Sequence, residues 1–585
     1  MQVFEAYHGA SALLGDDARR ERRSSRFLAL GLALFVLAAL PLCADLARYH
    51  GDERFYTDAA LGMERSGDWL TPRYADGGER WNKPLAAYWI IAGALRLFGH
   101  APFAARLPFL IAGGFTLWFT ARAARVLFDD PRAALLAAFA LGSSAEFLQL
   151  ATRSTPDALL AAGIAASLAG AAELVFSERP GRGAAWAFLG GAGFALVAKG
   201  ALGLLAPAFA FAWILARRGR AGAREALRPG ALGLFLLLAV AALLPMLLRG
   251  GEQGLARALD DQVGARAATS AAMVLDNLAT YARCLVQHLL PWSVLGALAF
   301  LFPSARDWAR SRRAQLGFAL GWYLALLFLF SLANLQRARY LFPGYPMVAA
   351  VLAALVCGAF AEGRSARVLR RFAVVLASLV LLASVALLLG TQKVGAASVE
   401  GLLAVLVAVA GLGLAVRVDG ALAAPAAALA LCVAQPLGER ALHAAFDASP
   451  AEALAERLEE LGARGGAVAC VGGEAKIASQ LRLLSAGRLD PTWSLGLEDA
   501  ELAGVHWLVL APEAARALAP EPRAEAALAP RAVAARDDCG FEYPRGRPAD
   551  ERAVLSSDDA GAALRERREA WVLVTLAAEP VRASR

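Results

Sequence analysis

The sequence predicts an all-α polytopic membrane domain followed by a small C-terminal α/β domain. Hydrophobic residues make up 58% of the 585 residues and charged residues only 19%, whereas soluble domains are about 45–50% apolar. Apolar runs of about 20 residues, the length of a membrane-spanning helix, recur through residues 1–440. Residues 441–585 lack such runs and alternate helical and strand patterns.

The first apolar run, Phe27 to Ala44, follows a cluster of arginines and lacks a clear small-residue cleavage site. We therefore interpret it as a retained anchor rather than a cleaved signal peptide. The formal net charge of +8 does not indicate a nucleic-acid partner. The basic residues sit in short loops between apolar runs, which is the pattern of cytoplasmic loops.

About thirteen runs are long enough to span a membrane. They begin near Phe27, Leu107, Ala133, Ala158, Ala184, Ala201, Ala231, Leu285, Leu316, Leu341, Phe372, Val399 and Leu422. The apolar segment from Pro84 to Phe98 is too short, and we predict an interfacial or re-entrant helix there. Residues 184–216 form either one long span or two short ones, broken at Lys199-Gly200.

The basic loops favour one topology. If residues 84–98 stay in the interface and residues 184–216 make two spans, three arginine-rich loops share the side of the basic N-terminus, as the positive-inside rule requires. Reversing both assignments partly restores the agreement, so that alternative stays open. The favoured topology puts a juxtamembrane loop over residues 48–105, three further loops (152–157, 249–283 and 331–340) and the tail outside, in the periplasm of a bacterium.

The tail predicts a small periplasmic α/β domain over residues 441–585. A helix is predicted over 451–461 and strands over 467–471, 507–510 and 571–576. Cys470 and Cys539 lie in this tail and would be able to pair outside the cytoplasm. Two isolated cysteines leave that pairing open.

Several charged and aromatic residues fall on the outer face. Each has an ordinary interpretation: solvated loop carboxylates for Asp52 and Glu53, a snorkelling anchor for Lys83, and a helix start for Asp157. Together they form a set of cations with one or two carboxylates. Such a set suits transfer from a phosphate carrier, because cations neutralise the departing phosphate and a carboxylate accepts the proton of an incoming hydroxyl.

The order of short motifs in the first 350 or so residues also resembles a known family. The motifs are Asp52-Glu53-Arg54-Phe55-Tyr56, Gly67-Asp68-Trp69-Leu70-Thr71-Pro72, Asn82-Lys83-Pro84-Leu85, Ala104-Ala105-Arg106-Leu107-Pro108, Arg153-Ser154-Thr155-Pro156-Asp157, Pro291-Trp292-Ser293 and Arg339-Tyr340-Leu341-Phe342-Pro343. They resemble the aminoarabinose lipid A transferases, which belong with the protein O-mannosyltransferase-like enzymes of the GT-C fold. Any one motif is weak, and seven in order are specific for the family but not for the substrate.

The resemblance implies an inner-membrane glycosyltransferase that takes a monosaccharide from a polyprenyl phosphate, undecaprenyl in a bacterium. The acceptor would be a lipid resembling lipid A, a glycan or a protein, and the reaction would invert the anomeric carbon. The expected catalytic residues are Asp52, as candidate base, and Asp157. The expected substrate-binding residues are Glu53, Lys83, Arg153, Arg266, Arg337 and Tyr340.

Two departures from the family remove its zinc ligands. A glutamate before the lysine is replaced by Asn82, and a histidine five residues before the arginine is replaced by Asp261. Asn is a poor zinc ligand, so we expect no bound metal or other cofactor, although a divalent ion is not excluded. The departures also leave the sugar and the acceptor open.

Two other functions would also account for parts of the sequence. A transporter or flippase for a lipid-linked or anionic substrate would place charges within the spans and discontinuous helices in paired halves. The sequence shows no such half-repeat, and its charges gather at one face. An envelope assembly protein whose C-terminal domain binds a partner would not need the dense loop around Asp52.

Overall fold

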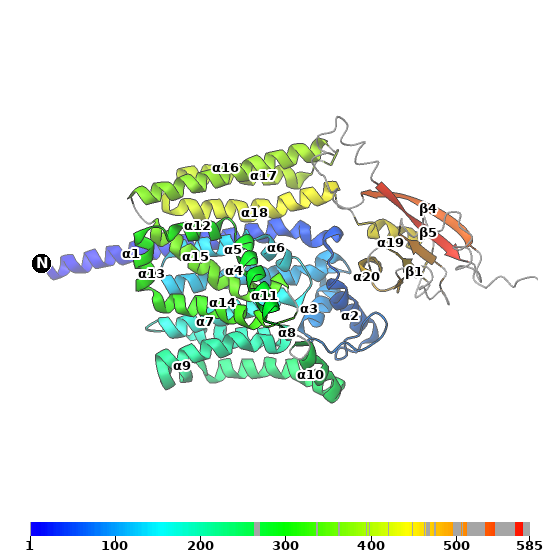
Figure 1. Cartoon of the computed structure of the whole chain (residues 1–585), viewed down its shortest axis with the longest axis horizontal. Coiled ribbons are helices and arrows are strands. Elements are labelled where there is room, and N and C mark those ends of the chain that lie inside the picture. The colour runs from blue at the N-terminus through cyan, green and yellow to red at the C-terminus, as the bar shows by residue number, and fades with distance from the viewer. Residues whose placement is uncertain are drawn as a thin grey trace, which may run out of the picture.

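The computed structural model describes most of the chain. It does not describe residues 1, 263–269, 335–336, 361–362, 394, 397, 419, 447–448, 461, 464–467, 473–474, 495–504, 506, 512–532, 545–567 and 577–585, nor the side chains of 2–20, 252–262, 363–364, 420–421, 446, 533–544 and 568–576. The predicted helical, polytopic architecture is confirmed. Its long helices lie side by side along the longest axis of the molecule (Figure 1).

The bundle is built from apolar helices, most of them of transmembrane length. They are α1 (Gln2–Ala44), α4 (Pro102–Phe128), α7 (Pro156–Phe176), α8 (Arg182–Lys199), α9 (Leu205–Ala226), α10 (Pro229–Gln262), α14 (Arg313–Ser331), α15 (Tyr345–Ala359), α16 (Gly363–Lys393), α17 (Val399–Arg417) and α18 (Gly420–Phe446). Helix α15 reaches that length only together with the turn before it, in the stretch Ala338–Ala359. Large apolar side chains such as Leu237 on α10 and Leu382 on α16 are exposed on the bundle surface. Such a surface suits lipid rather than water.

The number of spans depends on how breaks are counted. Within the described residues, ten stretches are long and apolar enough to cross a membrane, or eleven if the bent pair α5 (Pro131–Gly142) and α6 (Ala145–Ala151) is one span. One of the ten is the 45-residue stretch that holds both α8 and α9. At about 1.5 Å per residue that length far exceeds one crossing.

Contacts with α7 show that α8 and α9 run in opposite directions. Lys199, at the end of α8, pairs with Asp157 at the start of α7. Arg218, far along α9, donates a hydrogen bond of 3.0 Å to the carbonyl of Ser177 just after α7 ends. Each helix therefore extends along most of α7. This arrangement fits two spans broken at Lys199-Gly200 rather than one long span.

The span expected near Leu285 is not a continuous helix. The chain there forms α11 (Ala271–His288), α12 (Trp292–Ala299) and α13 (Pro303–Ser311). Asn277 on α11 donates to the carbonyls of Ser331 and Ala333 after α14, and Trp308 on α13 packs on Phe128 at the end of α4. The break falls at Pro291, whose ring removes a backbone donor and blocks an uninterrupted helix.

The juxtamembrane loop between α1 and α4 contains η1 (Leu46–Arg48), α2 (Glu53–Ser66) and α3 (Ala86–Phe98). Helix α3 has 13 residues. At about 1.5 Å per residue it is shorter than the roughly 30 Å hydrocarbon core of a bilayer. It packs on α2 and α4, and its place in the membrane interface stays a prediction.

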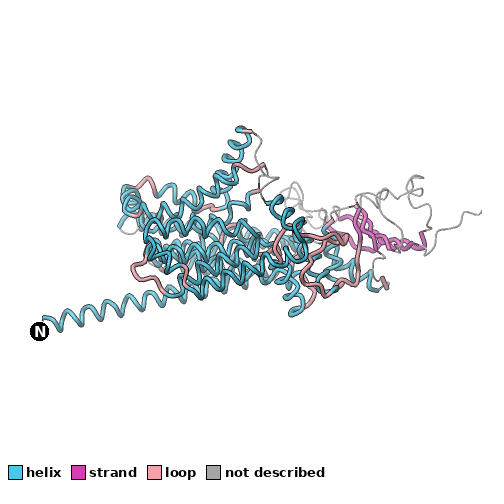
Figure 2. Tube along the Cα trace, turned by 90° about the horizontal axis from the view of Figure 1, so that it is seen from below, coloured by secondary structure: helices cyan, strands magenta, loops and turns pink. Residues whose placement is uncertain are grey.

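The C-terminal part carries a five-stranded sheet at the end of the molecule opposite the N-terminus (Figures 1 and 2). Its elements are α19 (Ala451–Glu460), β1 (Val468–Val471), α20 (Lys476–Leu484), β2 (Thr492–Ser494), β3 (Trp507–Leu510), β4 (Val533–Pro544) and β5 (Arg568–Leu576). The strand order is β2-β1-β3-β5-β4, with β1 parallel to β2 and β3, and β5 antiparallel to β3 and β4. The strands predicted over 467–471, 507–510 and 571–576 match β1, β3 and β5.

Cys470 lies buried in β1 and has no disulfide partner among the residues whose side chains are described. The side chain of Cys539 lies outside the described part of the structure, so the pairing stays open.

Candidate active site

A polar cavity of about 80 Å³ lies where the juxtamembrane loop meets α7, α8 and the 3-10 helix η4 (Ala338–Gly344). It is lined by Asp52, Tyr56, Lys83, Thr155, Asp157, Lys199, Leu202, Arg339 and Tyr340. Four residues predicted for the site, Asp52, Lys83, Asp157 and Tyr340, therefore share one cavity. Folding brings them together from positions as far apart as 52 and 340.

Asp52 is the carboxylate that the loop contributes. It is the residue before α2 and makes no side-chain cap to that helix; its Oδ2 instead accepts a hydrogen bond of 2.7 Å from Arg339. Burial alone would raise the pKa of Asp52, but the Arg339 guanidinium, with His50 and Arg337, lowers that pKa below its ordinary value. Asp52 is therefore ionised at neutral pH and fixed against a cation.

Asp157 is the second carboxylate, and its partner was not predicted. It lies in the first turn of α7 and forms a buried ion pair with Lys199 from the last turn of α8. The Lys199 Nζ also lies 5.8 Å from the ring centre of Tyr340. With Lys83 and Arg339, the cavity wall carries three cations against two carboxylates, an excess of one positive charge. That balance suits an anion.

The polar cavity adjoins an apolar crevice of about 10 Å³ within the bundle. The two share Asp157, Lys199, Leu202, Arg339 and Tyr340. The rest of the crevice is lined by Leu160, Ile164, Leu205, Leu326, Phe330 and Pro343. The crevice has room for about one water molecule, so the cations have a packed apolar wall beside them rather than an open channel.

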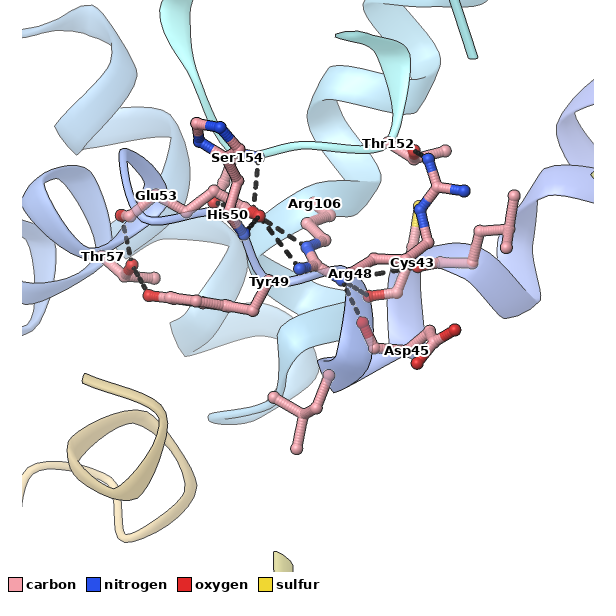
Figure 3. A network of polar contacts seen from close by, with 12 residues as sticks. Cys43, Asp45, Arg48, Tyr49, His50, Glu53, Thr57, Arg106, Thr152 and Ser154 are labelled. Carbon is pink, nitrogen blue, oxygen red and sulfur yellow. Dashed lines mark hydrogen bonds and ion pairs between the residues drawn. The ribbon is translucent and has the colours of Figure 1, made fainter. Parts of the chain in front are cut away.

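Glu53, the neighbour of Asp52, faces away from this cavity. Its side chain is completely buried, and Figure 3 shows it at the centre of a hydrogen-bond network. It accepts hydrogen bonds of 2.8–3.0 Å from two Arg106 nitrogens, from the backbone of His50, and from the backbone and hydroxyl of Ser154. Burial opposes ionisation, but Arg106 and these donors keep the pKa of Glu53 below its ordinary value.

Arg106 extends the network to the end of α1. Its guanidinium is fully buried and donates to the carbonyls of Leu42, Cys43 and Asp45 as well as to Glu53 (Figure 3). The pair therefore ties α1, α4, the loop and residue 154 into one rigid support. Asp52 is the residue before Glu53 and lines the cavity, so this support holds Asp52 in place.

Part of the chain matches a known family model, and the fold resembles a solved structure. Residues 82–248 match the family model described as dolichyl-phosphate-mannose-protein mannosyltransferase. The crystal structure of ArnT from Cupriavidus metallidurans bound to undecaprenyl phosphate superposes with a TM-score of 0.63 and 18% identity, covering 94% of this chain and 97% of that one.

The chain has the fold of ArnT. In sequence it resembles the undecaprenyl phosphate-alpha-4-amino-4-deoxy-L-arabinose arabinosyl transferases. It is 29% identical to one from Pseudomonas fluorescens over 64% of this chain and 65% of that protein, and 31% identical to one from Sodalis glossinidius over 32% and 34%. An uncharacterized protein of Aquifex aeolicus is 29% identical over 52% of this chain and 58% of its own length. The chain spans less than two thirds of the length of each of these relatives.

Not every residue predicted for the site lies in the cavity of this ArnT-like fold. Glu53 supports the loop instead, because its lone pairs are already bonded. The Arg337 side chain is 42% exposed and its Nη1 lies 3.7 Å from Asp52 Oδ2, but it does not line the cavity. Arg153 donates to the side chain of Gln149 and also lies outside the lining. Arg266 lies outside the described residues.

Tyr56, Thr155 and Leu202 line the cavity although the sequence does not predict them for the site, and so do two charged residues, Lys199 and Arg339. The sequence signal was present in both cases, since a charged residue within or beside an apolar run is a functional candidate by default. The sequence indicates Lys199 only as a break between spans. Arg339 belongs to one of the motifs and to the charged groups of the outer face, but it is not among the predicted site residues.

The zinc site of the resembled family does not fit the residues described here. The Asn82 Oδ1 accepts a hydrogen bond of 3.1 Å from the Tyr74 hydroxyl, and the Asp261 side chain lies outside the described set. Among the residues whose placement is described, no three His, Cys, Asp or Glu side chains gather as a metal-binding group. We therefore assign no role to a metal.

Proposed function

We propose that the protein is a multi-pass inner-membrane glycosyltransferase, which moves a monosaccharide from a polyprenyl-phosphate donor to an acceptor hydroxyl. The observation that carries this proposal is the cavity in which three cations and two carboxylates meet beside an apolar crevice. The names of the relatives support it, as does the undecaprenyl phosphate bound to the ArnT of similar fold.

The donor phosphate would lie among Lys83, Lys199 and Arg339. Arg suits bidentate contact with phosphate oxygens, and lysines add point charges. The first isoprene units would lie among the apolar side chains beside Tyr340, which would have to move apart because the crevice has room for only about one water molecule. Asp157 keeps the Lys199 ammonium in place, so that the positive charge already faces the phosphate when negative charge develops on it.

The reaction is a displacement at the anomeric carbon. The acceptor oxygen forms a bond to that carbon while the bond from the carbon to the phosphate oxygen breaks, with inversion. The electron pair of the broken bond leaves on the polyprenyl phosphate, where the cations stabilise it. Asp52 orients the acceptor hydroxyl and receives its proton, which then passes to water.

The lowered pKa of Asp52 limits its strength as a base. Proton transfer would therefore come late, after the acceptor oxygen has begun to bond to carbon and has become more acidic. Orientation is the larger part of the role of Asp52, because Arg339 fixes its carboxylate before the acceptor arrives.

The site would face the periplasm. The arginine-rich loops and the N-terminus lie at the other end of the bundle, where the positive-inside rule expects the cytoplasm. The acceptor would be a membrane lipid, a glycan or a protein exposed on the periplasmic side.

The direct test supplies membranes with an undecaprenyl-phosphate-linked monosaccharide carrying a label. Asp52→Asn, Lys83→Ala and Lys199→Ala should each abolish transfer of the label, since each removes a group from the cavity wall. Size-exclusion profiles should match the wild type for Asp52→Asn and Lys83→Ala. Arg310→Ala, whose side chain is 78% exposed on α13 outside the cavity, should keep full transfer.

Wild-type turnover in Asp52→Asn and Lys83→Ala would count against the proposal. The same experiment distinguishes the transporter alternative, because a flippase would move the labelled lipid across the bilayer without transferring its sugar.

A further inference from the structure

A second and larger cavity, of about 440 Å³, lies between the juxtamembrane loop and the C-terminal sheet and helices. We call it the loop–tail cleft. It is lined by Arg54, Phe55, Asp58, Tyr74, Ala75, Asp76, Ala475, Ala478, Ser479, Arg482, Asp490, Pro491, Thr492 and Trp493. Its volume is within the range of about 300–1,000 Å³ that is usual for small-molecule sites.

Helix α2 separates the loop–tail cleft from the catalytic cavity. Asp52 and Tyr56, four residues apart, line the catalytic cavity, while Arg54, Phe55 and Asp58 line the cleft. Residues four apart lie on one face of a helix, so the two cavities use different faces of the same element. A ligand in the cleft would therefore lie about one helix diameter, roughly 10 Å, from the donor site.

A hydrogen bond also links the two cavities. Tyr74 lines the cleft, and its hydroxyl donates to Asn82, the residue before Lys83. The loop that carries the donor-site lysine is thus fixed to the wall of the cleft.

Aromatic side chains give the cleft flat, fixed walls. The rings of Phe55 and Tyr74 meet edge to face at 6.0 Å. Trp493 is 40% exposed. Its indole nitrogen donates a hydrogen bond of 3.1 Å to the carbonyl of Gly472, and this bond fixes the ring in place. The negative face of an aromatic ring attracts the weakly positive C–H groups on the face of a sugar, and Tyr and Trp add a polar edge.

The polar groups of the cleft suit hydroxyls better than anions. Arg482 already pairs with Asp58 at 2.9 Å and with Asp490 at 2.8 Å. Two arginines and three aspartates line the cleft, so its charge sums to minus one, and a phosphate would be repelled. Arg54, whose guanidinium lies 4.6 Å over the Phe55 ring, has a buried Nε without a hydrogen-bond partner. A buried donor without a partner favours a ligand that brings an acceptor.

We infer that the loop–tail cleft binds an uncharged saccharide, stacked on Trp493 and hydrogen-bonded to Arg54, as part of the acceptor. Its role as acceptor rests on the proposed function, but the binding of the saccharide does not. The C-terminal domain would then select the acceptor, and α2 would present one of its hydroxyls to Asp52.

The binding test uses the full chain in lipid nanodiscs and a printed array of neutral oligosaccharides, anionic oligosaccharides and peptides, with no donor present. We expect retention of neutral oligosaccharides. Trp493→Ala and Arg54→Ala should each weaken it by about tenfold or more, since buried aromatic and arginine contacts dominate many binding sites. Trp118→Ala removes a tryptophan that is also 40% exposed, but on the membrane helix α4, and should change nothing.

The inference would be overturned by an array that retains only anionic glycans or only peptides, by no retention above background, or by equal retention in Trp493→Ala and the wild type. Transfer kinetics separate this outcome from failure of the proposed function. Trp493→Ala should raise the KM for the acceptor and leave the KM for the donor unchanged. Active transfer with an unchanged acceptor KM would overturn the inference alone, whereas saccharide binding without any transfer would overturn only the proposed function.

Discussion

Asp52 and Glu53 are adjacent carboxylates with opposite environments. Asp52 lines the cavity with a side chain that is 30% exposed and bonded to one guanidinium. Glu53 is fully buried and holds Arg106, His50 and Ser154. Successive residues at a helix start point about 100° apart, so one carboxylate reaches the cavity and the next reaches the support behind it. The first is available to substrate, and the second is not.

Replacing Glu53 should therefore damage the fold rather than only the chemistry. Glu53→Gln leaves the buried Arg106 guanidinium without its counter-ion, and removal of one partner of a buried pair costs about 3–5 kcal/mol. We expect a lower thermal midpoint for the detergent-solubilised protein, measured by loss of the monodisperse size-exclusion peak. Asp52→Asn is the matched control and should lower the midpoint less, because the Asp52–Arg339 pair is partly exposed and the Glu53–Arg106 pair is fully buried. Equal midpoints for the two variants would show that Glu53 is not structural.

The Asp52–Arg339 contact gives a prediction for pH. Because its folded-state pKa is depressed, Asp52 should stay ionised as pH falls from neutral to about 4, its ordinary range. Its contribution to stability is present above that range and is lost only as pH falls through the lowered pKa. Arg339→Gln removes the cation that does most to lower the pKa of Asp52, while burial, which raises that pKa, remains. The pKa of Asp52 should therefore rise, and the acidic limb of kcat/KM should move to higher pH.

A pH profile of transfer between about pH 4 and 8 measures this shift. Arg337→Gln serves as the control, because its guanidinium is farther from Asp52 and more exposed, and it should move the limb less. Identical acidic limbs in Arg339→Gln and the wild type would mean that Asp52 does not carry the acidic titration.

Residue types predicted the chemistry better than they predicted the partners. Asp52, Lys83, Asp157 and Tyr340 all line the cavity. The Asp157–Lys199 pair joins residues 42 positions apart on two helices, and local sequence does not reveal such a tertiary contact. Arg337 and Arg339 were equally plausible in sequence, and only the turn of η4 decides which of them faces the cavity.

At the scale of elements, glycines set the distance between the helices that carry this pair. A Cβ added at Gly163 on α7 would lie 2.7 Å from the backbone nitrogen of Ala195 on α8. One added at Gly191 on α8 would lie 2.6 Å from the carbonyl oxygen of Gly163. The two backbones are therefore in direct contact, as small residues permit in membrane helices. This contact brings the start of α7 against the end of α8.

A larger residue at Gly163 should act on the site from a distance. Gly163→Val must push α8 away from α7, which separates Lys199 from Asp157 and weakens the hold on the donor phosphate. We expect weaker binding of undecaprenyl phosphate, measured by titration in nanodiscs, and a loss of transfer. Gly233→Val on α10 is the control, since a Cβ there has no heavy atom within 4 Å. Normal binding in Gly163→Val would show that the helix contact does not set the site.

The predicted elements were most accurate where a single local pattern decides the structure. The short helix at 86–98, the helix at 451–460 and three strands of the C-terminal sheet followed from length and periodicity alone. The path near Leu285 did not, because Pro291 interrupts an apolar run that hydropathy counts as continuous. Residues 131–151 likewise bend by 74° at Ser143-Ser144, where Ser144 caps α6 and Ser143 accepts a hydrogen bond from Trp292.

At the scale of the whole molecule, the catalytic loop is held from two sides. Arg106 and Glu53 hold it against the bundle. On the other side, α20 of the C-terminal part packs on α2, where Ser479 bonds Tyr49 and Asp58, and Arg482 pairs with Asp58. The C-terminal part therefore contributes to the geometry of the loop as well as to the wall of the loop–tail cleft. Sequence patterns predicted its elements but not this docking, which joins positions more than 400 residues apart.

The same arrangement makes a prediction about membrane orientation. The N-terminus and the C-terminal sheet lie at opposite ends of the bundle (Figure 1), and the catalytic cavity lies toward the sheet. Since the arginine-rich loops favour the cytoplasm, the cavity and the tail should face the periplasm. Alkaline phosphatase fused after Arg585 should therefore be active, because that enzyme needs an oxidising compartment. The same reporter inserted after Arg310, on α13 at the other end, should be inactive. Green fluorescent protein at the two positions should give the inverse pattern. Activity of the phosphatase at Arg310 rather than Arg585 would place the cavity on the cytoplasmic side and would contradict the proposed orientation.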